Sequence, residues 1–296
     1  MPLNDGYVYR ERVAPPDAGV GVLAYHAARF PHSSLETWRA TIEAGRVRVN
    51  ELVADTDQIL CVGDRLEFHR PPWEEPEAPL TFEVVFEDDD VLVVEKPSGL
   101  QVLPAAQFYT HTLLHIVQRS ALDRAEAAPV HRLGRGTSGL ILFGKNAASR
   151  SFLSKQFIHC TAQKTYLALA EGTSLPISCI ARHPIGKRKH GPLDIHCVTD
   201  GGKASATRLR VLSRDFTLDR SLVAAQPITG RPDQIRVHLA ACGAPIVGDP
   251  LFGIGGVPKS DAKPGDGGYF LHAAALSIVH PTTKRLLKTR SRPAWL

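Results

Sequence analysis

The stretch Pro129-Val-His-Arg-Leu-Gly-Arg-Gly-Thr-Ser-Gly-Leu-Ile-Leu-Phe-Gly-Lys145 is the most informative part of this 296-residue chain. A glycine-rich loop with basic and hydroxyl side chains leads directly into the apolar run Leu140 to Phe143, which is typical of a buried strand. The loop is therefore expected at the edge of a sheet, where backbone N–H groups can bind a phosphate. It lacks the Walker pattern, and no helix follows the glycines as in a dinucleotide-binding loop. A tight structural loop with a surface arginine is the alternative.

The composition is that of an ordinary soluble globular protein, with 43% hydrophobic and 22% charged residues. No apolar run reaches the roughly 20 residues of a membrane helix, and the N-terminus shows no signal-peptide pattern. The five cysteines include no Cys-x-x-Cys pair, so we expect a reduced, cytoplasmic protein without a cysteine zinc site. The net charge of +5 favours polyanionic partners only weakly.

A change in composition divides the chain. Residues 70–79 hold four prolines and three glutamates, which excludes a regular helix or a central strand and predicts an extended connector. We therefore expect a small domain over residues 1–72, a linker over 73–79 and a larger domain over 80–296. The small domain is expected to contain a helix that begins after Ser34 and ends near Gly45.

After this helix the hydrophobic period changes to two, which predicts strands in "Ala-Gly-Arg-Val-Arg-Val-Asn" and "Val-Gly-Asp-Arg-Leu-Glu-Phe". This order resembles a small αβ RNA-binding module shared by a small-subunit ribosomal protein and several RNA-modifying enzymes, here called S-four-like. The resemblance covers about residues 20–70. It implies that Arg39, Arg46 and Arg48 contact RNA phosphates. The alternative is that these arginines only solvate the outer face of the hairpin.

The larger domain opens with two apolar runs, residues 81–86 and 91–95, that predict a hairpin. Its turn is acidic, but no calcium-loop pattern follows, so a solvated turn is favoured over a metal site. A helix is expected over residues 110–120. A basic loop is expected over residues 186–191, and it either contacts phosphates or is solvated.

"Val-His-Arg-Leu-x-x-x-Thr-Ser-Gly-Leu" within residues 129–145 resembles the central motif of the RluA-type RNA pseudouridine synthases. Other segments are similar to the same family in the same order: Glu87–Leu100, Lys164–Ala168, Pro184–Gly186, Gly202–Thr207, Thr229–Ala240, Pro245–Gly253 and Leu271–Thr282. The resemblance covers roughly residues 80–285. It implies an α+β pseudouridine synthase fold, with a mixed, mainly antiparallel sheet, flanking helices and a central cleft, preceded by the small αβ RNA-binding domain.

The resemblance also implies an activity, the isomerisation of uridine to pseudouridine in structured RNA without a cofactor. The target base must leave the helix or loop, and Arg132 matches the family arginine that holds the gap open. Tyr166 matches the tyrosine that packs on the target base, and Arg236 matches the arginine that pairs with the catalytic aspartate. A strand core residue and an exposed loop charge are the alternatives for Tyr166 and Arg132.

The chain departs from the family at the most important position. Gly134 stands where the resemblance implies the catalytic aspartate, and glycine supplies neither a lone pair nor a proton. A buried Arg236 without a carboxylate would be costly, so another carboxylate or an RNA phosphate should replace the missing partner. Asp233, which replaces the family's usual histidine, is expected near Arg236 at the N-cap of a short helix that ends before Gly243. The alternative is that Asp233 only caps this helix.

Three functions compete. The first is an active RNA pseudouridine synthase that takes its carboxylate from elsewhere, and the second is a catalytically inactive RNA-binding relative. The third, a nucleotide-binding protein that uses the glycines of the motif loop, is least favoured because no magnesium-carboxylate pattern accompanies them. Retention of Arg132, Tyr166 and Arg236 together favours the first. We expect a monomer without cofactor or metal, away from membranes, whose partner is RNA, ribosomal or transfer RNA above all.

Overall fold

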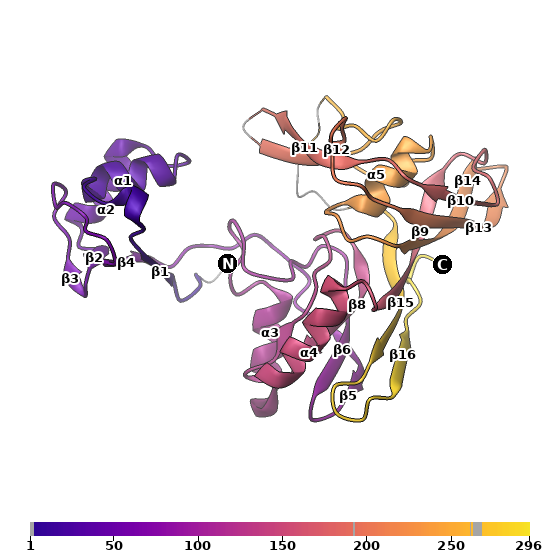
Figure 1. The fold of residues 1–296 in the computed structure, drawn as a ribbon, viewed down its shortest axis with the longest axis horizontal. Coiled ribbons are helices and arrows are strands. Elements are labelled where there is room, and N and C mark those ends of the chain that lie inside the picture. Colours follow the sequence, from indigo (N-terminus) through magenta and orange to yellow (C-terminus); the bar gives the residue numbers. More distant parts are fainter. Residues whose placement is uncertain (1–2, 192, 261, 263–267) are drawn as a thin grey trace. The chain divides into compact units, whose positions relative to one another are not determined.

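The chain divides into two compact units, Met1–Glu75 and Pro76–Leu296, and the division falls inside residues 73–79 (Figure 1). The computed structural model describes residues 3–191, 193–260, 262 and 268–296. In this described part, no helix is long and apolar enough to cross a membrane. Each unit has its own hydrophobic core, so the two are described separately.

The first unit packs two helices on one face of a four-stranded sheet with the order β1-β4-β2-β3. Its elements are β1 (Tyr7–Arg12), a 3-10 turn (Pro15–Asp17), α1 (Val22–Arg29), α2 (Leu35–Glu43), β2 (Val47–Val49), β3 (Leu52–Val53) and β4 (Arg65–Arg70). Ser34 caps α2 as expected, because its side chain accepts a hydrogen bond from the Thr37 N–H. Trp38 and Ile42 of α2 are buried against the sheet, whereas Leu35 is exposed.

The second unit is built on one ten-stranded sheet with the order β10-β13-β14-β9-β15-β8-β6-β5, with β16 beside β15 and β7 beside β8. Its strands are β5 (Glu83–Glu87), β6 (Val91–Lys96), β7 (Ala128–Pro129), β8 (Ser138–Gly144), β9 (Gln163–Glu171), β10 (Ser178–Ala181), β13 (Thr207–Asp215), β14 (Arg220–Pro227), β15 (Leu271–Val279) and β16 (Leu286–Arg290). Among the pairings between the named strands of the described residues, only that of β8 with β15 is parallel. The expected mixed, mainly antiparallel sheet is confirmed.

Helices cover both faces of this sheet. Alternate residues of β6 point to opposite sides, so Leu92 and Val94 pack with α3 (Leu113–Ser120), while Val91 and Val93 pack with α4 (Ala147–Ile158). A 3-10 turn (Leu122–Arg124) follows α3. In the other half of the sheet, α5 (Gln234–Ala241) packs through Ile235 against the core of β9, β13 and β14.

Three local predictions for the second unit need correction. The helix α3 begins after its N-cap residue Thr112, later than the expected 110, because the Thr112 hydroxyl accepts from the His115 N–H. The expected basic loop at 186–191 is largely the strand β11 (Ile185–His190). It pairs with β12 (Leu193–Val198), and Ile185 of β11 and Ile195 of β12 are buried in the same hydrophobic cluster.

The acidic turn of the β5–β6 hairpin is the third correction. The hairpin itself is confirmed, but Asp88 and Asp90 are not simply solvated. Asp90 accepts hydrogen bonds from Ser149, Thr282 and Asn146, and these bonds lower its pKa to about 2. The donors come from the start of α4 and from the loop after β15. The Asp90 carboxylate therefore connects the turn to both segments.

Gly139, in the Ser-Gly-Leu part of the motif stretch, allows β8 and β15 to approach. Its φ is +105°, and a Cβ built there would lie 2.5 Å from the carbonyl oxygen of Ala273 and 2.6 Å from its nitrogen. Ser138 and Gly139 pair in parallel with His272 and Ala273. Only glycine fits both the backbone conformation and the contact, so this residue sets how close the motif loop comes to β15.

We expect Gly139→Ala to lower the free energy of unfolding by about 2–4 kcal/mol, because left-handed strain and a backbone clash add. Urea denaturation of the whole chain measures the change. Gly172→Ala is the matched control, since Gly172 also has a positive φ, +83°, but no atom lies within 4 Å of a built Cβ. Equal decreases in the free energy of unfolding of the two variants would contradict the role of Gly139 in the close approach of β8 to β15.

Candidate active site

The motif loop, residues 130–137 between β7 and β8, is hydrogen-bonded to a buried lysine. Lys96 Nζ donates to the carbonyl oxygens of Pro97 at 2.7 Å, Leu100 at 2.8 Å and Arg135 at 3.1 Å. Burial, together with the charge of Arg135, lowers the pKa of Lys96 to about 7. Ser98 Oγ also donates to the Gly136 carbonyl oxygen, at 2.7 Å. The turn after β6 therefore holds the loop at several backbone atoms.

Residues of the His-Arg-Leu motif alternate between the interior and solvent. His131 Nε2 accepts from the Leu142 N–H at 3.1 Å, and its ring stacks on Phe157 at 4.6 Å. Leu133 is buried in the core. Arg132, between them, is exposed and makes no hydrogen bond or ion pair with the described residues. The two neighbours thus anchor the loop while Arg132 projects away from it.

Gly134 faces a tyrosine hydroxyl. Its backbone is outside the left-handed region, and a Cβ built there would lie 3.0 Å from Tyr269 Oη and 3.6 Å from Thr137 Oγ1. These two hydroxyl groups hydrogen-bond at 3.0 Å, and the Thr137 N–H donates to the Gly134 carbonyl oxygen. The space beside position 134 is therefore occupied by Tyr269, which immediately precedes Phe270 and β15.

Arg236 lies on α5 and is buried against two carboxylates. Its Nε and Nη2 donate to the two oxygens of Asp249, each at 2.8 Å, and Nη1 donates to Asp233 Oδ1 at 2.8 Å. The guanidinium carbon is 4.2 Å from the ring centre of Tyr269 and 5.0 Å from that of Phe252. Burial alone would lower the pKa of Arg236, but the hydrogen bonds that it donates to Asp249 and the nearby negative charges raise it. The side chain is a permanent cation.

Asp249 is the residue that the sequence analysis missed. Its side chain is 1% exposed, and Oδ1 also accepts from the Leu251 and Phe252 N–H groups. One signal was available, because Asp249 follows the apolar pair Ile246-Val247 and precedes Leu251-Phe252. A carboxylate buried among such residues needs a cation, and Arg236 is the buried cation of this site.

Asp233 differs from Asp249 in exposure and backbone. Its side chain is 31% exposed, and only Oδ1 has a partner among the hydrogen bonds described. It occupies the N-cap position of α5 as expected, but its φ is +53° and its side chain makes no capping hydrogen bond. The carboxylate instead turns toward Arg236, so its function as a side-chain cap is excluded. Left-handed backbone at a non-glycine residue is a cost that functional sites often carry.

Tyr166 lies in β9 between Ala225 of β14 and Ala273 of β15. It is partly buried and contacts both the cluster that contains Leu133 and the cluster that contains Tyr269. Burial raises the pKa of its hydroxyl to about 12, so the group is neutral and can donate a hydrogen bond. The structure thus places Tyr166 between the motif loop and the residues around Arg236.

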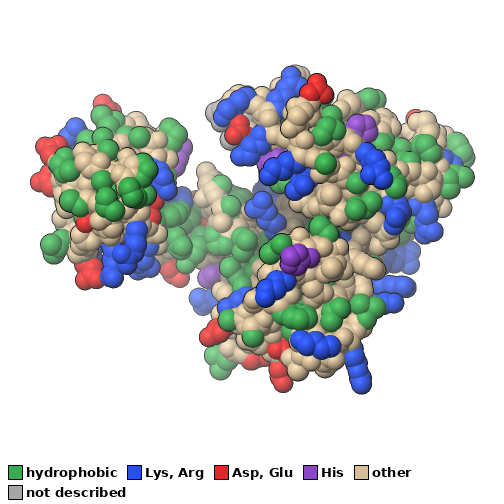
Figure 2. Space-filling view, in the orientation of Figure 1, with side chains coloured by type: hydrophobic (Ala, Val, Ile, Leu, Met, Phe, Trp, Pro, Cys, Tyr) green, Lys and Arg blue, Asp and Glu red, His purple; other side chains and the backbone are tan. Residues whose placement is uncertain are grey.

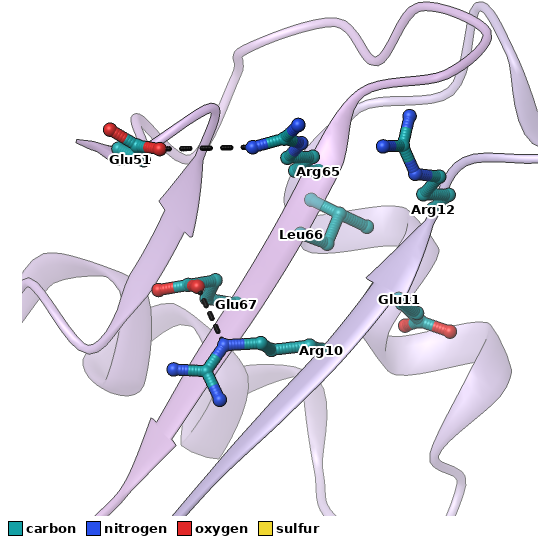
Figure 3. A pocket seen from close by; sticks show the side chains of 7 residues that line it. All are labelled: Arg10, Glu11, Arg12, Glu51, Arg65, Leu66 and Glu67. Carbon is teal, nitrogen blue, oxygen red and sulfur yellow. Dashed lines mark hydrogen bonds and ion pairs between the residues drawn. The ribbon is translucent and has the colours of Figure 1, made fainter.

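The three arginines expected to contact RNA lie in the first unit. Arg46 and Arg48 are exposed on the sheet face that points away from the helices, whereas Arg39 is exposed on α2, which packs on the other face. None of the three makes an ion pair with the described residues. Arg10, Arg12 and Arg65 line a depression across β1 and β4, where Arg10 pairs with Glu67 and Arg65 with Glu51 (Figure 3).

Comparison with known proteins relates the chain to one family. The sequence profile of the family described as RNA pseudouridylate synthase matches residues 90–241, which include the motif loop, Tyr166, Asp233 and Arg236. An uncharacterized RNA pseudouridine synthase of Synechocystis sp. is 37% identical, with 90% of this chain and 92% of the relative covered. RNA pseudouridine synthase 5 of Oryza sativa is 33% identical, with 97% and 86% covered.

A further relative and a solved structure agree with this assignment. The ribosomal large subunit pseudouridine synthase D of Neisseria meningitidis is 34% identical, and 88% of this chain and 71% of that protein are covered. The structure of human RNA pseudouridylate synthase domain containing 1 matches with a TM-score of 0.60 and 26% identity, and it covers 75% of this chain and 88% of that chain. The expected fold is therefore confirmed.

The buried histidines around the motif predict a pH dependence of stability. Burial, with a smaller effect of Lys164, lowers the pKa of His131 to about 3, and burial lowers that of His272 to about 4. Both are neutral in the folded protein but titrate near 6.5 when unfolded. Their contribution is complete above pH 6.5 and is lost as the pH falls. We expect these two histidines to decrease the free energy of unfolding by up to about 2.7 kcal/mol per pH unit below pH 6.5.

Urea denaturation between pH 7 and 4.5 measures this slope, in a range above the carboxylates whose pKa is lowered. His131→Gln keeps an acceptor near the Leu142 N–H but removes the titration, so the slope should fall by up to about 1.4 kcal/mol per pH unit. A slope that does not change in this variant would refute the assignment to His131.

Proposed function

The chain belongs to the RNA pseudouridylate synthase family, and we propose that it isomerises uridine to pseudouridine in structured RNA. Enzymes that change a base extrude it from the stack into a pocket. The observation that carries the proposal is the cluster of Arg236 with Asp233 and Asp249, beside Tyr166 and the motif loop. The name of the Neisseria relative makes large-subunit ribosomal RNA the first substrate to test.

Asp233 is the carboxylate that we assign to the reaction in place of the aspartate absent at Gly134. Both oxygens of Asp249 are used by Arg236, and its side chain is buried. Asp233 gives one oxygen to Arg236 and is partly exposed. A reacting carboxylate needs a free lone pair within reach of the ribose or the base, and of the two only Asp233 meets this condition.

Arg132 and Tyr166 complete the proposed site. Arg132 is exposed on a loop whose neighbours are anchored, which suits a side chain that enters the gap left by a flipped nucleotide. Tyr166 presents an aromatic ring in the middle of the sheet, and base–aromatic stacking is worth roughly 1–3 kcal/mol per base. We assign Arg132 to filling the gap that the extruded nucleotide leaves, and Tyr166 to packing on the extruded base.

One observation favours the second function, a catalytically inactive RNA-binding relative. The space beside Gly134 is filled by the Tyr269 hydroxyl, and because burial raises the pKa of this hydroxyl, it stays protonated and does not replace a carboxylate as a base. The two functions share the same RNA surface and differ in whether pseudouridine forms. Mapping pseudouridine in RNA before and after incubation with the protein therefore separates them.

We also propose that residues 1–72 are an S-four-like RNA-binding domain. Arg48 of β2 lies opposite Glu67 of β4, and the carbonyl oxygen of Arg46, just before β2, accepts the N–H of His69. Arg10 of β1 lies on the other side of β4, opposite Glu67. Arginines without carboxylate partners attract phosphates independently of base sequence. Arg39, on α2, is assigned to a second contact with the RNA.

The second unit offers cations near the proposed site. Lys187 and Arg188 are exposed on β11, and Figure 2 shows Lys and Arg side chains gathered in this part of the surface. The β11–β12 hairpin packs on α5 through a cluster that includes Ile185, Cys197 and Val237. Arg236 is on α5, and the hairpin packs directly on this helix. RNA phosphates bound by the hairpin would therefore lie close to the proposed site.

The carboxylate assignment is tested by Asp233→Asn. We expect this variant to form no detectable pseudouridine in ribosomal RNA transcripts, because an amide supplies no carboxylate lone pair. Asparagine tolerates left-handed backbone at least as well as aspartate, so the fold should persist. Reverse-transcription mapping and thermal unfolding are the two measurements.

Asp219→Asn is the matched control, because Asp219 has a similar left-handed φ of +48° but lies in the turn between β13 and β14. We expect it to retain activity. If the wild type and Asp233→Asn modify RNA at the same rate, another carboxylate acts. If the wild type forms no pseudouridine in any RNA tested but binds it, the second function holds.

The RNA surface of the first unit is tested through salt dependence. Replacing Arg46 and Arg48 by Gln removes two phosphate contacts, so the slope of log K against log salt should decrease in magnitude by roughly 1.4–1.8. The control replaces Arg29, which pairs with Glu11, and Arg70, which lies on the Trp73 ring, and should leave the slope nearly unchanged. Equal slopes for the two double variants would contradict the proposed surface.

A further inference from the structure

Gly134 lies beside the hydroxyl group of Tyr269, and the proposed activity gives no reason for this contact. Gly134 is exposed and needs no positive φ, so its backbone accepts other residues. The obstacle to a side chain is the contact of 3.0 Å between a built Cβ and Tyr269 Oη. Whether alanine or aspartate fits at 134 therefore depends on whether Tyr269 can move.

Tyr269 is held on several sides. The residue is 5% exposed, and its hydroxyl is hydrogen-bonded to Thr137 on the motif loop. Its ring covers the Arg236 guanidinium at 4.2 Å, and that guanidinium is in turn bound by Asp249 and Asp233. Moving the hydroxyl away from position 134 would break the bond to Thr137 or shift the ring from Arg236. Close-packed interiors transmit such a shift rather than absorb it.

We propose that Tyr269 is the positioning residue of this site, joining the motif loop to Arg236, and that Gly134 is the glycine that admits its hydroxyl. The loop and α5 come from distant parts of the chain, and Tyr269 contacts both. This inference rests on the proposed function only for its effect on turnover. The packing of Gly134 against Tyr269 can be tested separately.

The packing is tested by a double-mutant cycle on stability with Gly134→Ala, Tyr269→Phe and the double variant. We expect Gly134→Ala to lower Tm by about 2–4 °C in the wild-type background, the shift of roughly 1 kcal/mol in a domain of this size. In the Tyr269→Phe background the hydroxyl is absent, so the same substitution should change Tm by less than half as much. Gly230→Ala is the control, because nothing lies within 4 Å of a Cβ built there.

The positioning role is tested by the kinetics of Tyr269→Phe. Because the variant retains the ring but loses the bond to Thr137, we expect kcat for pseudouridine formation to fall about tenfold while KM changes less than twofold. Tyr25→Phe removes the hydroxyl of a tyrosine that is also 5% exposed, in the first unit, and should leave kcat unchanged. A merely structural role would lower the stability of both variants without lowering kcat.

Aspartate at position 134 provides a second readout. Gly134→Asp should lower Tm more in the wild-type background than in the Tyr269→Phe background, because the hydroxyl and the new carboxyl group compete for the same space. Additive Tm changes in both cycles would overturn the proposal, as would unchanged kcat in Tyr269→Phe. If the wild type forms no pseudouridine but the Tm changes are coupled, the proposed function fails while the packing of Gly134 against Tyr269 stands.

Discussion

The buried ion pair of Arg236 with Asp249 is the interaction on which the candidate site depends. Removing two charges from water is costly, and only good geometry with further hydrogen bonds compensates. Both conditions are met here, because the pair is bidentate and Asp249 also accepts two backbone N–H groups. The pair joins α5 to the segment before β15. Asp233 and Tyr269 are then arranged around a cation that cannot move without leaving a charge unpaired.

The motif loop is held in place by different means. Lys96 and Ser98 bind its backbone carbonyl groups, and Gly139 lets β8 lie close to β15. These contacts use the main chain, so they leave the side chain of Arg132 free for a ligand. A site that must extrude a base needs a rigid frame with a few projecting groups. The loop and α5 therefore form two fixed sides of the site, with Tyr269 between them.

A glycine at position 134 supplies no carboxylate on the loop, yet Arg236 is not left unpaired. Asp249 and Asp233 both lie on the Arg236 side, so the guanidinium is satisfied without a carboxylate at position 134. This explains physically how a buried Arg236 is compatible with a glycine at position 134. The carboxylate with an oxygen to spare is Asp233, and the reaction that we propose therefore uses the helix side of the site.

The local features were predicted from the sequence because they depend on neighbours a few residues apart. Period-two alternation predicted the β5–β6 hairpin, and the Ser34 cap predicted the start of α2. A separation of three residues predicted that Asp233 would lie near Arg236. The same reasoning treated Asp88 and Asp90 as solvated, because their donors come from α4 and from the loop after β15.

The sequence by itself thus determined the family resemblance, the division near residues 73–79 and the lack of a side chain at position 134. Only the tertiary structure decided how Arg236 is neutralised and what lies beside Gly134. Asp249 is 13 residues from Arg236, and Thr137 is 132 residues from Tyr269. Such contacts follow from the pairing of β8 with β15 and from the packing of α5 on the sheet. Periodicity and spacing within one segment do not predict contacts between residues that lie far apart in the sequence.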